Sequence, residues 1–248
     1  SGTLYKAGMG IPLNVGLLPF FAFGSFLGSV HLDRWLSLGQ LAPIALQDEW
    51  GSTPALGITM AGLAGFVLLT RLWVGPGKRW IDARWIWGAI GLAALTTLNL
   101  ILAGQPWGVV YGFGLWVAKV ATASGLFDPL TNAFWSQPGQ LQLLGQSALL
   151  DVTTITNLGI LSGALWIAQG KNSSEQLDQS ALTPQQWAIG MGAGFILGYS
   201  SRLAFGCNVG AMLSGISTGS LHGWIWVIMA FAGSCVGVKV RRRFGFGA

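Results

Sequence analysis

The residue with the clearest chemical potential is Cys207, which lies in an apolar, glycine-rich stretch between Gly198 and Trp226. A thiol is a weak hydrogen-bond donor, and its sulfur is soft and polarizable. It can therefore contact a sulfur-containing ligand without holding it tightly, which conduction requires because tight binding traps a passing ion. We expect the thiol to be neutral, since a thiolate would repel an anion. The alternative is a small buried side chain that serves packing alone.

The residues around Cys207 interrupt what would otherwise be an ordinary membrane helix. Gly206 and Gly210 flank the thiol, Asn208 follows it, and Arg202 precedes it. Non-helical backbone inside a bilayer is tolerated only where protein covers it or where it lines a cavity. Glycine-interrupted segments are typical of substrate sites in transporters built from repeats. The pattern predicts a broken or re-entrant element; a tightly packed helix pair with an inert cysteine is the alternative.

Ionisable residues inside apolar stretches are functional candidates by default. Lys119 lies in such a stretch and, like Arg202, could attract an anion or neutralise Asp151. The alternatives are a structural ion pair or a long side chain that extends to the membrane surface. Asp151 would itself repel an anion, so we expect it either to pair with Lys119 or to take part in proton coupling.

The composition indicates an all-α, polytopic integral membrane protein. Of the 248 residues, 52% are hydrophobic and 8% are charged, whereas about 25% are charged in soluble domains. The apolar runs are continuous rather than alternating, which favours helices over a barrel in the lipid bilayer. The net charge of +5 gathers at helix flanks and indicates no nucleic-acid partner. The sequence holds no P-loop, HExxH, CxxC or GxSxG motif, so we expect neither a metal nor a cofactor.

Long apolar runs predict the spanning helices. They cover residues 15–32, 54–73, 85–103, 141–168, 184–205 and 223–240. Basic residues gather in the 74–84 loop and at the C-terminus, which predicts that both are cytoplasmic. The 169–183 loop carries few positive charges and suits the outside. These placements agree only if residues 184–221 enter and leave by one face, with Cys207 at the tip of a membrane hairpin.

The two ends of the chain are weakly similar, which predicts two related halves with glycine-broken helices. SGTLYKAG at the start aligns with VGAMLSGI after Cys207, and GSFLG at 24–28 then falls near GSCVG at 233–237. We divide one transmembrane domain, residues 1–248, into a first half at 1–103 and a second half at 104–248. The alignment puts the counterpart of Cys207 ahead of Ser1, so we expect the first half to be shortened at its front.

Several stretches carry a family resemblance. RLAFGCNVGAMLSGISTGSLHGWIW resembles the C-terminal signature of the YeeE/YedE sulfur-transport family, the thiosulfate-uptake membrane proteins of bacteria. GQPWGVVYGFGLWVAK and LLDVTTITNLGILSGALW resemble its middle motifs, and SGTLYKAG followed by GSFLGSVHL resembles its N-terminal repeat. Family members usually have Gly-Cys-Ala just ahead of that repeat, and they pass thiosulfate along a row of cysteines. Only Cys207 of that row is present here.

The resemblance implies uptake of thiosulfate, or a similar small sulfur anion, across the bacterial inner membrane. It also implies no cofactor and cooperation with a small cytoplasmic sulfur-carrier protein. The residues we place in the substrate path are Cys207, Asn208, Gly206, Gly210, Arg202, Lys119, Gln105 and Tyr111, and their N-terminal counterparts are Ser1, Gly2 and Thr3.

Two other functions stay open at this point. The chain could be a non-transporting accessory subunit of a larger membrane assembly. It could also be a membrane sulfurtransferase with Cys207 as the sulfur-accepting nucleophile and His222 as its base, although sequence spacing does not establish contact between these two residues.

Overall fold

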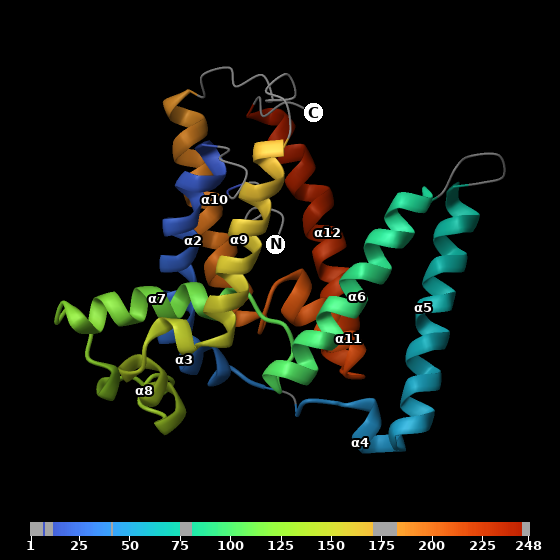
Figure 1. Ribbon diagram of the computed structural model, residues 1–248, viewed down its shortest axis with the longest axis horizontal. Helices are drawn as coiled ribbons and strands as arrows, with labels where there is room; N and C mark the ends of the chain where they lie inside the picture. The colour runs from blue at the N-terminus through green and yellow to red at the C-terminus, as the bar shows by residue number, and fades with distance from the viewer. Residues whose placement is uncertain (1–6, 8–11, 41, 75–80, 171–182, 245–248) are drawn as a thin grey trace.

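The computed structural model describes all residues except 1–6, 8–11, 41, 75–80, 171–182 and 245–248 (Figure 1). The N-terminal counterparts Ser1, Gly2 and Thr3 thus lie outside the described residues. The α-helices are α2 (Pro12–Val30), α3 (Leu32–Leu36), α4 (Leu46–Trp50), α5 (Ser52–Val74), α6 (Ala83–Ala103), α7 (Val110–Ala123), α8 (Pro138–Gly145), α9 (Val152–Gly170), α10 (Pro184–Leu203), α11 (Ser214–Ser217) and α12 (Leu221–Arg243). Short 3₁₀ turns η1 (Pro129–Thr131) and η2 (Ala148–Leu150) and a π-helix η4 (Asn208–Leu213) complete the described elements.

The described part of the chain confirms the all-α membrane fold. Four helices are long and apolar enough to cross a membrane: Leu13–Val30, Ser52–Val74, Ala83–Ala103 and Leu221–Arg243. They confirm the spans predicted at 15–32, 54–73, 85–103 and 223–240. Helix α6 has no buried residue, and α5 touches α12 where the Trp224 ring lies against Gly62. Apolar helix faces as open as these suit contact with lipid.

Helices α2 and α10 form the centre of the fold and lie side by side (Figure 1). Glycines bring the two backbones together: a Cβ at Gly198 would lie 2.0 Å from the carbonyl oxygen of Phe21. A Cβ at Gly24 would likewise lie 2.2 Å from the carbonyl oxygen of Phe195. Close packing of this kind is how small residues stabilise helix pairs in lipid, where the hydrophobic effect contributes little.

Helix α7 crosses the α2–α10 pair instead of running along it (Figure 1). The Ser25 side chain of α2 donates a 3.0 Å hydrogen bond to the carbonyl oxygen of Val110, at the start of α7. Phe113 and Leu115 of α7 are buried against α2 and its neighbours. This crossing brings the middle of the chain beside the turn that follows α10.

The chain reverses direction between α10 and α12, and Cys207 lies in that reversal. The Gln186 amide at the start of α10 donates to the carbonyl oxygen of Phe244 at 3.4 Å, so this start and the end of α12 lie at one end of the molecule (Figure 1). The predicted hairpin of residues 184–221 is therefore wrong. Helix α10, which packs on α2 through its glycines, runs away from that end for about 30 Å. After the turn that holds Cys207, α12 returns the chain to the same end.

The helix predicted at 141–168 is also wrong as a single span. Helix α8 ends at Gly145, and α9 begins only at Val152. The Ser147 side chain accepts from the backbone N–H of Leu149, so it caps a new turn instead of continuing the helix. The Lys119 ammonium donates to backbone carbonyls that end α8. Side chains thus replace the backbone hydrogen bonds that a continuous helix would need across the break.

Candidate functional site

A strained turn after α10 places Cys207. Phe205 has a φ of 54° and Gly206 a φ of 149°. Residues other than glycine rarely adopt positive φ values such as these. A Cβ at Gly206 would lie 2.6 Å from the backbone nitrogen of Ala211, so glycine is required there. The carbonyl oxygen of Cys207 then accepts from the N–H of Ala211 at 2.8 Å as the π-helix η4 begins. π-helical turns are frequent at functional sites.

The Cys207 side chain is half-buried and lies between the core and a small cavity. On one side it packs against the buried cluster of Ala22, Val109 and Phe113. On the other it lines a cavity of about 70 Å³, which is room for a few water molecules or one small ion. Within the described residues the thiol makes no hydrogen bond.

A second, more polar cavity of about 480 Å³ lies next to the first. Tyr111 of α7 and Arg202 of α10 line both cavities, so these two side chains stand between the larger space and the thiol. Gln105 and Asp151 also line the larger cavity.

Contacts from three parts of the chain hold the Arg202 guanidinium in place. Its Nε donates a 2.7 Å hydrogen bond to the hydroxyl of Ser29, which is itself buried in α2. Its Cζ lies 4.6 Å from the ring centroid of Phe134 and 5.6 Å from that of Tyr111, both within cation–π range. No carboxylate pairs with Arg202 in the described part of the chain, so its charge is available to an anion.

Lys119 is not among the residues that line either cavity. Its ammonium donates to the backbone carbonyls of Leu143, Leu144 and Gln146, which end α8 and the segment after it. The hypothesis that Lys119 pairs with Asp151 is not met by any ion pair between described residues. The geometry gives Lys119 the role of a helix cap that joins α7 to α8.

A third cavity of about 350 Å³ lies on the other side of the Cys207 turn. It shares Gly108, Phe205 and Gly210 with the small cavity beside the thiol. His222 lines only this third space, and its Nε2 lies 3.0 Å from the carbonyl oxygen of Ala204. His222 and Cys207 therefore line different cavities, and the described residues show no hydrogen bond between that imidazole and the thiol.

The structure thus brings together most of the residues expected in the substrate path. Tyr111, Arg202, Gly206, Cys207 and Gly210 line one cavity, and Gln105 lines the next. Asn208 is exposed and is the first residue of η4, whose N-cap position is Cys207.

Sequence reasoning missed three residues that support the site. They are Ser29, which binds Arg202, Phe134, whose ring faces the guanidinium, and Gln140, which accepts a hydrogen bond from the hydroxyl of Tyr111. The only signal for Ser29 was its place in a Gly-Ser pair repeated every four residues of α2. Nothing local marked Phe134 or Gln140.

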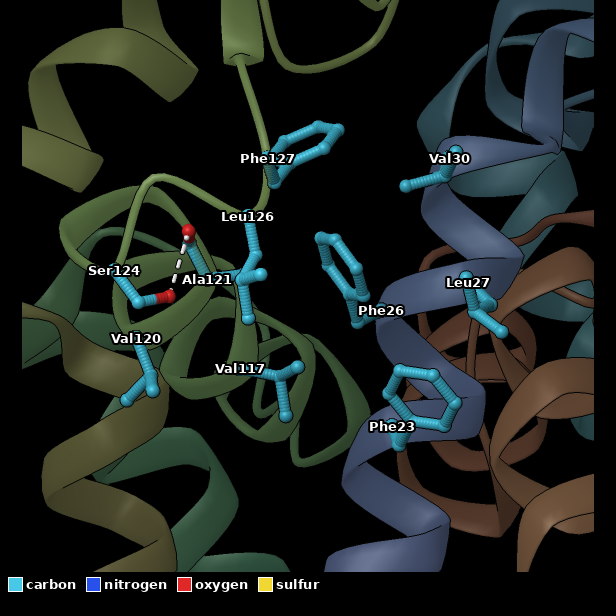
Figure 2. A pocket seen from close by; sticks show the side chains of 10 residues that line it. All are labelled: Phe23, Phe26, Leu27, Val30, Val117, Val120, Ala121, Ser124, Leu126 and Phe127. Carbon is cyan, nitrogen blue, oxygen red and sulfur yellow. Dashed lines mark hydrogen bonds between the residues drawn. The ribbon is translucent and has the colours of Figure 1, made fainter.

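A further cavity, of about 420 Å³, is lined almost entirely by apolar side chains and therefore does not suit an anion. Figure 2 shows Phe26 and its α2 neighbours facing Val117 of α7 and the turn that follows that helix. The lining is hydrocarbon except for the Ser124 hydroxyl, which donates to the carbonyl oxygen of Ala121 at 3.1 Å. No lining side chain carries a charge, so this cavity has no group that could hold a dianion.

Comparison with known proteins finds similarity to one family and to two curated transporters. A family model described as "Sulphur transport" matches residues 1–236. The chain is 29% identical over 166 residues to "Probable transporter YedE" of Escherichia coli (strain K12), a match that covers 64% of this chain and 39% of that protein. It is 27% identical over 173 residues to the protein of the same name in Salmonella typhimurium (strain LT2), which covers 67% of this chain and 40% of the relative.

The chain spans about two fifths of the length of these curated relatives. No solved structure matches it.

Proposed function

The chain belongs to the sulphur-transport family of membrane proteins, and we propose that it takes up thiosulfate, or a closely similar sulfur anion, along a path that passes Cys207. One observation carries this proposal. Arg202, which has no acidic partner among the described residues, lines both the polar cavity and the small cavity of the thiol. The cation therefore lines the cavity that the thiol lines and also the larger polar cavity.

The larger cavity suits capture of a small dianion. Coulomb attraction to a guanidinium that is partly shielded from water is stronger than in bulk solvent. Arg202 is held by Ser29 and by two aromatic rings, so little reorganisation is needed when the anion arrives. The Gln105 amide adds a neutral hydrogen-bond donor to the same wall, whereas the Tyr111 hydroxyl already donates to Gln140.

The smaller cavity suits transfer and not storage. A neutral thiol offers a weak donor and a polarizable surface to the terminal sulfur of thiosulfate. Besides the thiol, the donor side chains that line this cavity among the described residues are the Arg202 guanidinium and the hydroxyls of Tyr111 and Ser201. Sites that bind weakly in sequence let an ion move on, which is the condition for conduction.

The accessory-subunit and sulfurtransferase alternatives draw less support from this geometry. A sulfurtransferase would need a base next to Cys207, and His222 instead lines a different cavity from the thiol. We further propose, from the family resemblance, that the protein lies in the bacterial inner membrane. The basic residues at the end of α12 support a cytoplasmic C-terminus. The same resemblance suggests that a small sulfur-carrier protein receives the anion there.

Uptake of ³⁵S-labelled thiosulfate by cells that carry the full-length gene tests the proposal. We expect Cys207→Ala to abolish most uptake and Cys207→Ser to retain little of it. The matched control is Cys235→Ser, which removes the exposed cysteine of α12 and should leave uptake unchanged. Normal uptake by both Cys207 variants, at wild-type amounts in the membrane, would contradict the proposal. A persulfide on Cys207 in the wild type would favour the sulfurtransferase instead.

A further inference from the structure

A buried carboxylate shares the larger cavity with the Arg202 cation. Asp151 is 6% exposed, at the start of α9, and lines this cavity. A carboxylate in the path of an anion repels it, so its presence there needs a reason. We propose that Asp151 takes up a proton when the anion binds, so that anion uptake is coupled to protons; this rests on the proposed function.

The hydrogen bonds of Asp151 leave one oxygen available for that proton. Its Oδ2 accepts from the hydroxyl of Thr153 at 2.5 Å and from the backbone N–H of Thr154 at 2.7 Å. Its Oδ1 has no hydrogen-bond partner within the described residues. The carboxyl group can therefore carry a proton on Oδ1 while Oδ2 keeps both donors, and the cap of α9 survives protonation.

The charged and titratable groups around Asp151 come from two other helices. Arg202 of α10 and Tyr111 of α7 line the same cavity, and the Lys119 ammonium of α7 is close enough to interact electrostatically. Lys119 is bound to backbone carbonyls, and the Tyr111 hydroxyl donates to Gln140. None of these three forms an ion pair with Asp151 among the described residues, so no fixed partner keeps the carboxylate charged.

The coupling follows from charge balance in the cavity. Without an anion, the carboxylate and the guanidinium line the same cavity but form no ion pair among the described residues. A bound dianion engages Arg202 and repels the carboxylate, so a proton from the water in the cavity binds Oδ1 and removes the repulsion. No bond within the anion is made or broken. Linkage is reciprocal: if the anion favours protonation of Asp151, then protonation favours binding of the anion by the same factor.

This coupling would help to drive uptake. A dianion entering a cell moves two negative charges against a membrane potential that is negative inside. A proton carried on Asp151 would halve the net charge that moves with each anion. The remaining net charge of −1 would still move against the potential, so the proton would lower the electrical cost of uptake without removing it.

The competing reading is that Asp151 only caps α9. Asp151→Asn separates the two readings, because asparagine is an equally good N-cap but cannot be ionised. Asp151→Ala removes both functions and serves as the structural control. Wild type and Asp151→Asn should therefore unfold at similar temperatures in detergent, whereas Asp151→Ala should unfold at a lower temperature.

The experiment is calorimetric titration of the purified full-length protein with sodium thiosulfate, in pairs of buffers that differ in protonation enthalpy. We expect wild type to take up close to one proton per anion and to bind more weakly as the pH rises from mildly acidic to mildly alkaline. Asp151→Asn should take up none, and at the alkaline end should bind roughly 5- to 150-fold more tightly than wild type.

Two outcomes would overturn the inference, and they are distinguishable. Thiosulfate binding by both proteins with the same affinity, no pH dependence and no proton uptake would refute the coupling and leave the proposed function standing. No binding by wild type or Asp151→Asn, both folded, would refute the proposed function and the coupling with it.

Discussion

Replacing Arg202 with glutamine removes the one guanidinium that faces both the polar cavity and the thiol cavity, within the part of the chain that the structure describes. Glutamine keeps a hydrogen-bonding end group and similar reach, so the change is mainly one of charge. If the account is right, thiosulfate should reach Cys207 less often, and the KM for uptake should rise more than the maximal rate falls.

The magnitude follows from the surroundings of the guanidinium. A unit charge about 4 Å from a cation gains about 4 kcal/mol at an effective dielectric constant of about 20. Part of this is offset because the anion loses water and because Arg202 already donates to Ser29. The net effect should resemble a hydrogen bond to a charged group, about 1.5–3 kcal/mol. At tenfold per 1.4 kcal/mol, the KM should rise roughly 10- to 150-fold.

Two milder variants should raise the KM by less than Arg202→Gln does. Arg202→Lys keeps the charge but loses the planar stacking on Phe134 and the geometry of the bond to Ser29. Ser29→Ala leaves the arginine but removes the neutral acceptor of its Nε, which costs about 0.5–1.5 kcal/mol; it also removes the hydrogen bond that Ser29 donates within α2 to the carbonyl oxygen of Ser25. The KM should therefore increase from wild type through Ser29→Ala and Arg202→Lys to Arg202→Gln.

The assay is initial uptake of ³⁵S-labelled thiosulfate over a range of concentrations, normalised to the amount of protein in the membrane. Raising the ionic strength should reduce the difference in KM between wild type and Arg202→Gln, because salt screens charges that solvent can reach. An unchanged KM for Arg202→Gln, with normal protein amounts, would refute the idea that this cation recruits the anion.

Three further changes test the scaffold, each by uptake and by thermal unfolding in detergent. Gly206→Ala forces a side chain into a left-handed turn and should cost about 1–3 kcal/mol and most uptake, whereas Gly210→Ala, whose nearest contact would be 3.8 Å away, should fold normally. Gly198→Ala should separate α2 from α10 and cost at least about 1–3 kcal/mol; Gly192→Ala, with open space around it, should be harmless. Lys119→Met should lose about 1.5–3 kcal/mol of stability with no change in KM, because its ammonium binds backbone carbonyls.

Each pair has its own contradicting result. Equal stability of the Gly206 and Gly210 alanine variants would mean that the turn relaxes at no cost. Equal stability of the Gly198 and Gly192 variants would mean that the glycine contacts between α2 and α10 are not essential. A raised KM for Lys119→Met at wild-type stability would restore the hypothesis that Lys119 attracts the anion.

The parts of the fold with a strong local signal were predictable from the sequence. Long apolar runs located the helices that became α2, α5, α6 and α12 within a few residues. The glycines around Cys207 correctly indicated a break in the helix, because few other residues adopt the φ of Gly206. The break between α8 and α9 was missed because apolar residues continue across it. Ser147 and Asp151, two good capping residues, were the available sign.

The supporting contacts of the site could not be predicted, since they join distant parts of the chain. Ser29 lies 173 positions from Arg202, and no local pattern shows that two helices will meet at that point. The same limit applies to the hairpin at 184–221. Charge bias suggested which side each loop occupies, but the direction of α10 is set by its glycine contacts with α2.

The most direct measurement is the rate at which Cys207 in the full-length protein is alkylated by a small maleimide, with and without thiosulfate. Cys235 on α12 is the internal control, because it is exposed and lines none of the cavities described above. We expect thiosulfate to slow the alkylation of Cys207 but not that of Cys235. Sulfate should slow the alkylation of Cys207 less than thiosulfate does. If Cys207 fails to react, or reacts at the same rate in saturating thiosulfate, the thiol does not face the substrate path.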